Sequence, residues 1–373
     1  MDNYQICKKC IMDRSDPKIT FDKDGICSHC HYFEEVRRPN WFPNAEGKKI
    51  LDQTIASIKD RRKNFKYDCM IGLSGGVDSS YLAYVLKKEY NLRMLAVHVD
   101  AGWNSELAVS NIENIVKKLK IDLFTHVVDW QEMKSLQVAF LKSGVVNQDT
   151  PQDHAFFAGL YMAAEKFKIK DFLVGQNIQT ESILPQSWQG LTAMDTIQLK
   201  YINNRFGTRK LKKFPTVSLF KQHLYYPRVY GFKKFIPLNY MPYNKEKAKE
   251  IIINELGWRD YGVKHGESKW TKFFQSYFLP TKCGFDKRRA HLSSLILSKE
   301  ITRSEAEALI KEPVYKSERE IEEDKEYVTK KLDISLEDMN KFLENRCIDY
   351  REYDNAQNFL EKIRKIKKII SRK

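Results

Sequence analysis

Two hydrophobic spacings alternate along the first half of the chain, and this alternation predicts the fold. Short apolar runs with the length of buried strands lie at 68–73, 94–99, 123–128 and 171–175. Around them, apolar residues recur every three or four positions, as in amphipathic helices, over 79–88, 107–119, 131–141 and 154–167. Strands that alternate with helices predict an α/β fold with a doubly wound parallel sheet. Ligands of such sheets bind beyond the carboxyl ends of the strands.

The regions on either side of this pattern differ from it. The first 45 residues are short on apolar side chains, and the rhythm is lost again after about residue 200. Ile50, Leu51, Ile55 and Ile58 recur at helical spacing between these regions and the first strand. We therefore predict four parts, namely a small module at 1–45, a linker helix at 46–66, the sheet domain at 67–245 and a mostly helical region at 246–373. The basic and apolar run at 363–370 fits either a membrane-surface helix or a helix end packed on the domain.

Four cysteines give the small module its expected chemistry. Cys7, Cys10, Cys27 and Cys30 form two C-x-x-C pairs separated by sixteen residues, a spacing typical of zinc sites. Four thiolates leave no open coordination position, so we expect a structural Zn²⁺ in a zinc-ribbon-like module. His29 or His31 could replace a cysteine as ligand, or both could be surface histidines.

Charge and hydropathy limit the classes of function. Lys and Arg outnumber Asp and Glu by 64 to 49, which gives a net charge of +15. This excess attracts anionic partners or substrates, although an ordinary basic surface would show the same balance. The chain has no apolar run long enough to span a membrane and no apolar stretch near Met1 typical of a signal peptide. We expect a cytoplasmic protein.

The sequence Ser74-Gly75-Gly76-Val77-Asp78-Ser79-Ser80 joins the first strand to the first helix. Its glycines allow a sharp turn whose N–H groups converge on an anion, and the following helix adds its N-terminal partial charge. A carboxylate would repel a bare phosphate, so Asp78 either holds Mg²⁺ against one or caps the helix. The loop matches neither the Walker A pattern nor the dinucleotide fingerprint.

This loop resembles the PP-loop of the ATP pyrophosphatase superfamily (HUP-type fold), which includes GMP, asparagine and argininosuccinate synthetases and tRNA thiolation enzymes. The resemblance implies that the loop binds the β,γ-pyrophosphate of ATP and that a substrate oxygen attacks the α-phosphorus. The ATP-binding residues that it implies are Gly72, Ser74, Gly75, Gly76, Asp78, Ser79, Val99, Asp100 and Gly175. Asp100 could instead be a turn aspartate.

Further motifs narrow the family. They are Asp100-Ala101-Gly102-Trp103-Asn104-Ser105, Thr150-Pro151-Gln152-Asp153-His154, the stretch from Gly175 to Glu181, Lys264-His265-Gly266-Glu267-Ser268 and the segment 284–296. With the cysteine pairs, these motifs resemble the N-acetyl sugar amidotransferases of surface polysaccharide and O-antigen (lipopolysaccharide) synthesis. The resemblance implies that ATP adenylates the acetamido oxygen of a nucleotide-linked N-acetyl sugar. Ammonia then displaces AMP and leaves an acetamidino group.

The product of that reaction is a cation, which a nearby carboxylate would favour. Our candidates are Glu181 and Glu267, and each could equally be a surface or salt-bridged glutamate. His154 and His265 are candidate proton shuttles or else capping or core histidines. With Asp78, the proposed catalytic set is Glu181, His154 and Glu267.

The candidate substrate-binding residues are polar or cationic side chains of the same motifs, namely Asn104, Asp153, Asn177, Lys264, His265, Lys287, Arg288 and Arg289. The Lys287-Arg288-Arg289 triplet would clamp a diphosphate, since Arg offers bidentate contacts, or it would form an exposed helix face.

The source of ammonia is expected to be a second protein. Glutamine hydrolysis needs a nucleophilic cysteine with a histidine and an acid. Cys69 opens a buried strand, and Cys283 and Cys347 lack the expected elbow motif. The resemblance implies a separate HisH-like glutaminase, together with a HisF-like cyclase homologue.

Two rival functions remain open. A PP-loop tRNA-thiolating enzyme would share the loop, the basic charge and the zinc pairs. Such enzymes usually carry further cysteines downstream, and here only Cys283 and Cys347 lie there, without an evident pairing. A non-enzymatic zinc-ribbon binding protein on a degenerate nucleotide fold is disfavoured by the intact loop.

Overall fold

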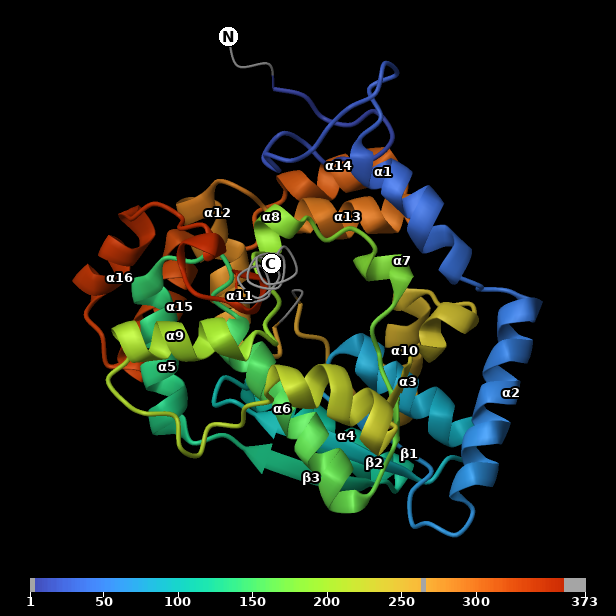
Figure 1. Ribbon diagram of the computed structural model, residues 1–373. Coiled ribbons are helices and arrows are strands. Elements are labelled where there is room, and N and C mark those ends of the chain that lie inside the picture. Colours follow the sequence, from blue (N-terminus) through green and yellow to red (C-terminus); the bar gives the residue numbers. More distant parts are fainter. Residues whose placement is uncertain (1–3, 263–265, 359–373) are drawn as a thin grey trace, which may run out of the picture.

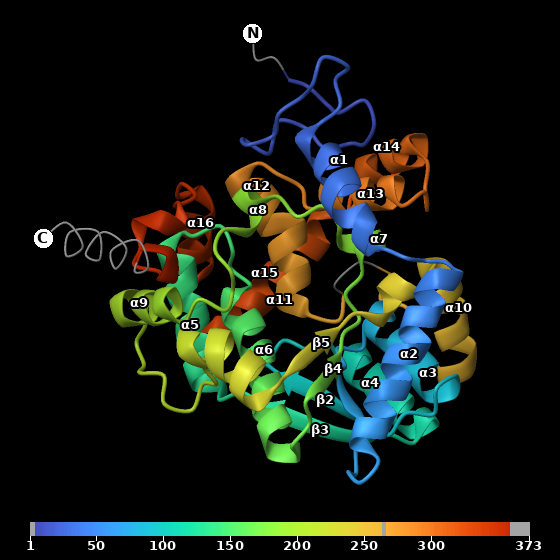
Figure 2. The ribbon, with the colours of Figure 1, turned by 45° about the vertical axis from the view of Figure 1, so that its right-hand side comes forward.

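The structure is a computed structural model that describes residues 4–262 and 266–358. A sheet of five parallel strands, in the order β3-β2-β1-β4-β5, lies in the lower part of Figures 1 and 2. The strands are β1 Cys69–Gly72, β2 Met94–Asp100, β3 Asp122–Val127, β4 Asp171–Leu173 and β5 Lys233–Phe235. The strand order reverses between β1 and β4, and the crevice at such a switch point is where doubly wound folds bind ligands.

Both faces of the sheet are covered by helices, as the hydrophobic runs predict. On β1, Cys69 and Ile71 point into one core while Met70 points into the other. The first core is closed by α2 (Ala45–Arg62), α3 (Val77–Lys88), α4 (Glu106–Leu119) and α10 (Lys245–Leu256). The second is closed by α6 (Thr150–Phe167). The α/β fold class is confirmed.

The sequence analysis does not predict β5. β5 is only three residues long, and two of them are Lys233 and Lys234, so no hydrophobic run marks it. It forms an edge of the sheet, where strands are often short and charged. The helix α10, which follows the predicted boundary at residue 245, packs Ala248, Ile252 and Leu256 into the core of the sheet.

The rest of the chain is helical, as expected of the C-terminal region. A third core joins α5 (Trp130–Ser143) and α9 (Thr196–Phe206) to α11 (Lys269–Phe273), η5 (Phe274–Phe278), α12 (Leu279–Cys283), α15 (Glu318–Leu332) and α16 (Leu336–Glu344). The remaining helices are α1 (Ser28–Tyr32), η1 (Phe33–Arg37), η2 (Arg38–Asn40), α7 (Ile178–Glu181), α8 (Gln186–Gln189), η3 (Lys221–Tyr230), η4 (Pro237–Tyr240), α13 (Arg288–Leu297), α14 (Arg303–Lys311) and η6 (Tyr350–Glu352). The run at 363–370 lies outside the described residues.

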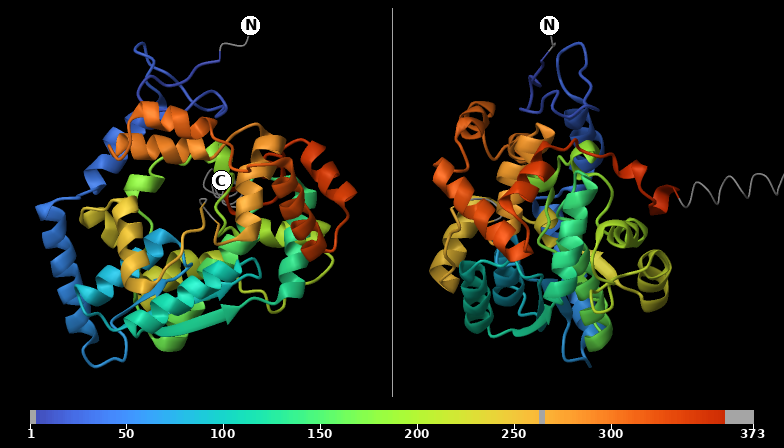
Figure 3. Two further views of the ribbon diagram at one scale, coloured as in Figure 1. Left: turned by 180° about the vertical axis from the view of Figure 1, so that it is seen from behind. Right: turned by 90° about the vertical axis from the view of Figure 1, so that its left-hand side faces the viewer.

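The N-terminal module, blue at the top of Figure 1, packs on α13 and α14. These two helices are the orange ones beneath the module in Figure 3. Ile11 N donates to Ser293 Oγ at 3.2 Å, and the Arg289 guanidinium pairs with Asp13 at 3.0 Å. Arg303 donates to the carbonyl oxygens of Cys7 and Cys10 at 3.2 and 3.3 Å. The module is therefore bound to residues almost three hundred positions later in the chain.

The same helix α13 also contacts α7, on its other side. His291 Nδ1 lies 2.8 Å from the Thr180 carbonyl oxygen, and Ile183 N donates to Ser294 Oγ at 3.0 Å. Ser298 Oγ donates to the Gln179 carbonyl oxygen at 3.2 Å. α13 thus connects the N-terminal module to the segment that follows β4.

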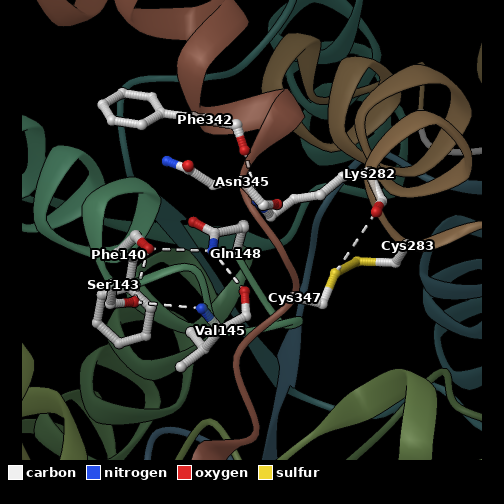
Figure 4. Close-up of a disulfide and its surroundings, with 9 residues drawn as sticks. All are labelled: Phe140, Ser143, Val145, Gln148, Lys282, Cys283, Phe342, Asn345 and Cys347. Carbon is white, nitrogen blue, oxygen red and sulfur yellow. Dashed lines mark hydrogen bonds between the residues drawn. A yellow bond between two sulfur atoms is a disulfide. The ribbon is translucent and has the colours of Figure 1, made fainter.

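Cys283 and Cys347 form a disulfide with their Cα atoms 6.1 Å apart (Figure 4). It joins the end of α12 to the segment after α16, whose Ile348 N donates to the Gly144 carbonyl oxygen at 2.8 Å. The expectation that these cysteines have no pairing is therefore wrong. A spacing of 64 residues gives no sign of a disulfide, because only the folded helices bring the two together. None of the helices among residues 4–262 and 266–358 has the length and apolar character to cross a membrane.

Candidate functional site

The loop from Ser74 to Ser80 turns sharply between β1 and α3. Gly75 has φ +82°, and a Cβ atom there would lie 3.0 Å from Tyr261 Oη. Its carbonyl oxygen accepts hydrogen bonds from Trp258 Nε1 at 2.7 Å and Tyr261 Oη at 3.0 Å. These two side chains hold the back of the loop in place, so no residue with a side chain fits at Gly75 without strain.

Hydroxyl groups fix the front of the same loop. Ser74 Oγ lies 3.2 Å from Ser79 Oγ and accepts a hydrogen bond from Gly76 N at 3.3 Å. The Gly76 carbonyl oxygen accepts from Ser79 Oγ at 3.2 Å and from Ser80 Oγ at 2.7 Å. Ser74 is exposed, whereas Ser80 is buried and serves the turn itself. The loop is a preformed nest at the start of a twelve-residue helix and can bind an anion.

Gly175 lies against this loop from the neighbouring strand. A Cβ atom on it would come within 3.0 Å of Ser79 N and Ser79 Cα. The segment after β4 can therefore approach the N-terminus of α3 only because residue 175 is glycine. At Gly72, the end of β1, a Cβ atom would lie 3.7 Å from Phe172 and 3.8 Å from Leu160. Four implied ATP residues, Gly72, Gly75, Gly76 and Gly175, thus converge on the switch point.

Asp78 and Glu181 both face Tyr243. The Tyr243 hydroxyl donates a hydrogen bond to Asp78 Oδ1. Burial raises the pKa of Tyr243 far above its ordinary value, and the negative charges of Asp78 and Glu181 raise this pKa further. Tyr243 therefore stays a donor and fixes the Asp78 carboxylate at the first turn of α3. The sequence analysis missed Tyr243, since no motif surrounds it.

A polar cluster follows β2 at the other side of the loop. Asn104 Nδ2 donates to His98 Nε2 at 2.9 Å and to Asp100 Oδ1 at 3.1 Å. His98 Nδ1 lies 2.9 Å from the Leu73 carbonyl oxygen, so its proton sits on Nδ1. Burial lowers the pKa of His98 and keeps the ring neutral. Asp100 also accepts from Gly102 N at 2.8 Å, as a turn aspartate would. Val99 is buried against Gly159 of α6.

The segment around Glu267 joins this edge from the C-terminal half of the chain. Ser268 pairs with Asn104 in an antiparallel bridge, and Ser105 N donates to the Glu267 carbonyl oxygen at 2.9 Å. The Glu267 carboxyl oxygen lies 3.6 Å from where a Cβ on Gly76 would be, so it is next to the loop. Lys264 and His265 lie outside the described residues.

Asp153 and Lys287 are brought near each other at the start of α6. Asp153 keeps some exposed surface, yet burial of its carboxyl group and the charge of Asp149 raise its pKa to about 7, against the opposing effect of Lys287. Asp149 accepts a hydrogen bond from Gln275 Nε2 at 3.2 Å. Gln152, one residue before Asp153, accepts from Ser268 Oγ at 3.2 Å, which connects this acidic pair to the Glu267 segment.

Four further candidates make structural contacts. His154 is fully buried, with Nδ1 2.8 Å from the Ala193 carbonyl oxygen and Nε2 accepting from Val217 N at 3.3 Å. Arg288 binds Asp286 and the carbonyl oxygens of residues 310 and 312, and Arg289 binds the N-terminal module. Asn177 Oδ1 caps α7 through Thr180 N at 2.9 Å. The buried His154 matches the core alternative given above, whereas Arg288 and Arg289 bind other parts of the chain instead of forming an exposed helix face.

The four cysteines of the N-terminal module form one buried cluster. Their Sγ atoms lie within 4.8 Å of one another, and three of the pairs are 3.7 Å apart. A tetrahedron of sulfurs about 2.3 Å from a central Zn²⁺ has edges of about 3.8 Å. Cys7 Sγ also accepts from Cys10 N at 3.4 Å and Cys27 N at 3.3 Å, which stabilises a thiolate. The donor set fits a metal ion.

Neither histidine of this module belongs to the cluster. His29 Nε2 lies 2.7 Å from Asp16 Oδ2, and His31 Nε2 lies 2.8 Å from Asp22 Oδ2. The alternative in which one of them replaces a cysteine is therefore wrong in this structure.

Comparison with known proteins adds the following. Residues 267–367 match the family model of the LPS biosynthesis protein WbpG-like, C-terminal domain. An uncharacterized protein of Methanocaldococcus jannaschii is 28% identical over 34% of this chain and 44% of its own length. A glutamine-hydrolyzing GMP synthase of Elusimicrobium minutum is 29% identical over 43% of this chain and 29% of its own length. The chain thus spans less than half the length of these curated relatives.

Among solved structures, NMN synthetase from Francisella tularensis is 16% identical and covers 62% of this chain and 93% of its own, with a TM-score of 0.28. The parallel five-stranded sheet and the Ser-Gly-Gly-x-Asp-Ser loop between its first strand and α3 are the features that the resemblance to PP-loop proteins predicts. The match to the WbpG-like C-terminal domain concerns the C-terminal part of the chain, residues 267–367.

Proposed function

We propose that the protein is an ATP-dependent amidotransferase. It adenylates the acetamido oxygen of a nucleotide-linked N-acetyl sugar, and ammonia then displaces AMP to leave an acetamidino group. One observation carries the proposal. The WbpG-like region begins at residue 267, and this residue and its neighbour Ser268 pair with the loop after β2, beside the phosphate loop. The matched region therefore starts next to the loop that we propose to bind ATP.

The phosphate loop is suited to pyrophosphate as a leaving group. Its N–H groups, the hydroxyl groups of Ser74 and Ser79 and the N-terminus of α3 all offer hydrogen bonds or positive potential to an anion. Asp78 is the residue that would hold Mg²⁺, because Tyr243 fixes its carboxylate at the edge of this nest. Mg²⁺ would neutralise charge that develops on the leaving pyrophosphate.

Carboxylates supply the complement for the cationic product. Glu267 lies next to Gly76, and the Asp149–Asp153 pair is connected to the same segment through Gln152 and Ser268. The Glu267 carboxylate would favour an amidinium over the neutral amide from which it is made, whereas Asp153, whose pKa is raised to about 7, is only partly ionised at neutral pH. Glu181 is close enough to Tyr243 and Lys234 that its negative charge raises the pKa of both groups. His154 carries no step, since backbone groups occupy both of its ring nitrogens.

The metal of the N-terminal module is proposed to be Zn²⁺ in a structural role. Four cysteines with tetrahedral separations leave no position for a substrate. Ammonia is proposed to come from a separate HisH-like glutaminase with a HisF-like companion. Glutamine hydrolysis would need a reactive cysteine. Cys69 is fully buried, and burial raises the pKa of its thiol, so Cys69 does not serve as that nucleophile.

The experiment is a reaction of the purified chain with ATP, Mg²⁺, ammonium and a panel of nucleotide-linked N-acetyl sugars. We expect AMP release and a product lighter than the substrate by the difference between O and NH. Asp78→Ala should abolish AMP formation and leave the metal content unchanged, because the cysteine cluster is in a separate module. A panel that gives no such product overturns the proposal, and release of ammonia from glutamine by the chain alone overturns the partnership.

One observation keeps tRNA thiolation as a second candidate. Cys283 and Cys347 are close enough to form a disulfide, so the chain does hold a downstream cysteine pair. Their surroundings in Figure 4 come from α5, α12 and the segment around α16 and not from the phosphate loop. Incubation with tRNA and a sulfur donor, followed by mass spectrometry of the nucleosides, tests this candidate. A thiolated nucleoside that Cys347→Ser abolishes would replace the amidotransferase proposal.

A further inference from the structure

A cavity of about 190 Å³ lies on the α6 face of the sheet and has no role in the site described above. Its walls come from α6, β4, η3 and the segment that leads into β5, and η3 is the yellow helix beside α6 in Figure 2. Its lining includes Tyr161, Phe172, Gln222, Tyr226, Phe232 and Lys234. The cavity is thus built mainly from the stretch in which the sequence shows no clear period.

The walls are aromatic and already packed. The rings of Tyr161 and Tyr226 stack with their centroids 4.0 Å apart, and Phe232 lies 5.0 Å from Tyr161. Phe172 lies 5.9 Å from Phe232 on the side of the sheet. Rings held in place by one another offer a rigid surface on which a planar ligand can stack at little entropic cost.

Two polar groups interrupt this aromatic lining. Gln222 Oε1 is buried and has no hydrogen-bond partner among the described residues. An acceptor left in this state is costly, and a ligand N–H group would satisfy it. Lys234 Nζ donates to Gln176 Oε1 at 2.6 Å, and burial lowers the pKa of this amine although part of its side chain is exposed.

The position of Lys234 connects the cavity to the nucleotide site. Gln176 directly follows Gly175, which packs against α3, and Phe172 contacts the position of Gly72 just before the phosphate loop. The segment that forms η3 and β5 is rich in cations. Residues 196–245 carry eleven Lys and Arg residues and no Asp or Glu. This composition favours an anionic ligand over a cationic one, although Glu165 pairs with Lys221 nearby.

We propose that this cavity binds the pyrimidine base of a nucleoside diphosphate and that Lys234 contacts the diphosphate. The inference rests on the proposed function and names the nucleotide that carries the sugar. A volume of about 190 Å³ is below the roughly 300–1,000 Å³ of drug-sized ligand sites, so it admits one ring and not a whole nucleotide. The amide of Gln222 can accept from a ring N–H and donate to the adjacent carbonyl, which is the edge that uracil presents.

The test measures binding of UDP, dTDP, CDP and GDP by calorimetry with a saturating non-hydrolysable ATP analogue, so that the ATP site is filled. We expect UDP or dTDP to bind and GDP to bind at least about tenfold more weakly. Gln222→Leu, which keeps the size of the side chain, should weaken UDP binding by about tenfold or more. Lys234→Ala should weaken UDP but not uridine. Lys233→Ala, the neighbouring lysine outside the cavity, is the matched control and should change neither.

Several results would overturn the proposal. They are absence of any UDP binding, equal affinity for all four diphosphates, or a Gln222→Leu protein with an unchanged melting temperature and unchanged UDP affinity. These outcomes are distinct from failure of the amidotransferase function. If acetamidino product forms and Gln222→Leu leaves KM unchanged, the cavity assignment fails alone. If UDP binds as expected but no sugar is amidinated, the proposed reaction fails and the base site stands.

Discussion

Gly175 offers the sharpest test of how the nucleotide site is assembled. A Cβ atom at this position would lie 3.0 Å from Ser79 N and Ser79 Cα and 3.1 Å from the Asp78 carbonyl carbon. All three are backbone atoms at the first turn of α3, so no side-chain rotation relieves the contact. Gly175→Ala must therefore move the segment after β4, or α3, or both.

The expected cost has two components. Overpacking of this kind costs about 1–3 kcal/mol of folding free energy, and each kcal/mol lowers Tm by roughly 2–4 °C in a domain of 150–250 residues. A shift of a few tenths of an ångström would relieve the contact, and since a displacement of about 1 Å lowers kcat by about 10²-fold, this smaller shift should lower kcat by a smaller factor, on the order of several-fold. We therefore expect a modest loss of stability together with a measurable loss of AMP formation.

The assay follows AMP and pyrophosphate release together with Tm. Gly207→Ala is the matched control, since its Cβ would lie 2.6 Å from the Asn203 carbonyl oxygen at the end of α9, away from the loop. It should lose stability and keep the activity of the folded fraction. A Gly175→Ala protein with wild-type turnover would refute the claim that the close approach of residue 175 positions the loop.

Three further predictions concern other groups. Tyr243→Phe removes the donor to Asp78 and should raise the Mg²⁺ concentration needed for half-maximal AMP formation, as read from a Mg²⁺ titration; an unchanged titration contradicts the role of Tyr243. The folded-state pKa of Asp153, about 7, lies above its unfolded value of about 3.9, so its contribution to stability is lost as pH rises through this window. Asp153→Asn should match wild type in urea unfolding at pH 4 and exceed it at pH 8. Cys10→Ser should lower the bound metal, measured by atomic emission, and weaken the contact with α13, whereas Cys69→Ser should leave the metal content as it is.

The regular part of the fold is predictable because its hydrophobic periods are strong. Helix α4 was expected at 107–119 and spans Glu106–Leu119, with Ile112 and Ile115 buried as the period requires. β5 was not expected, because Lys233 and Lys234 at a sheet edge carry no hydrophobic signal. Its existence depends on pairing with β4, which is a property of the folded chain.

The residues of the candidate site also fall into two groups, those that a local sequence pattern predicts and those that only the folded chain brings to the loop. The loop residues and the cysteine pairs are local in sequence, so their spacing alone predicts a nest and a metal cluster. Tyr243 and Trp258 act on this loop from more than 160 residues away, and no local pattern marks them. Conversely, Arg289 has the composition of an anion clamp, but the fold places it on Asp13. Charge in a motif does not show which partner the tertiary structure supplies.

The contacts of α13 have a consequence for the order in which the protein matures. The cysteine module is made before α13 and α14, because Ser293, Arg289 and Arg303, to which it binds, lie close to three hundred residues later in the chain. During most of synthesis the module therefore lacks the helices on which it packs. It is also too small to fold on apolar burial alone. A bound metal ion would keep it folded during that interval. Since α13 also contacts the segment of α7, we expect loss of this metal to weaken the packing on both sides of α13.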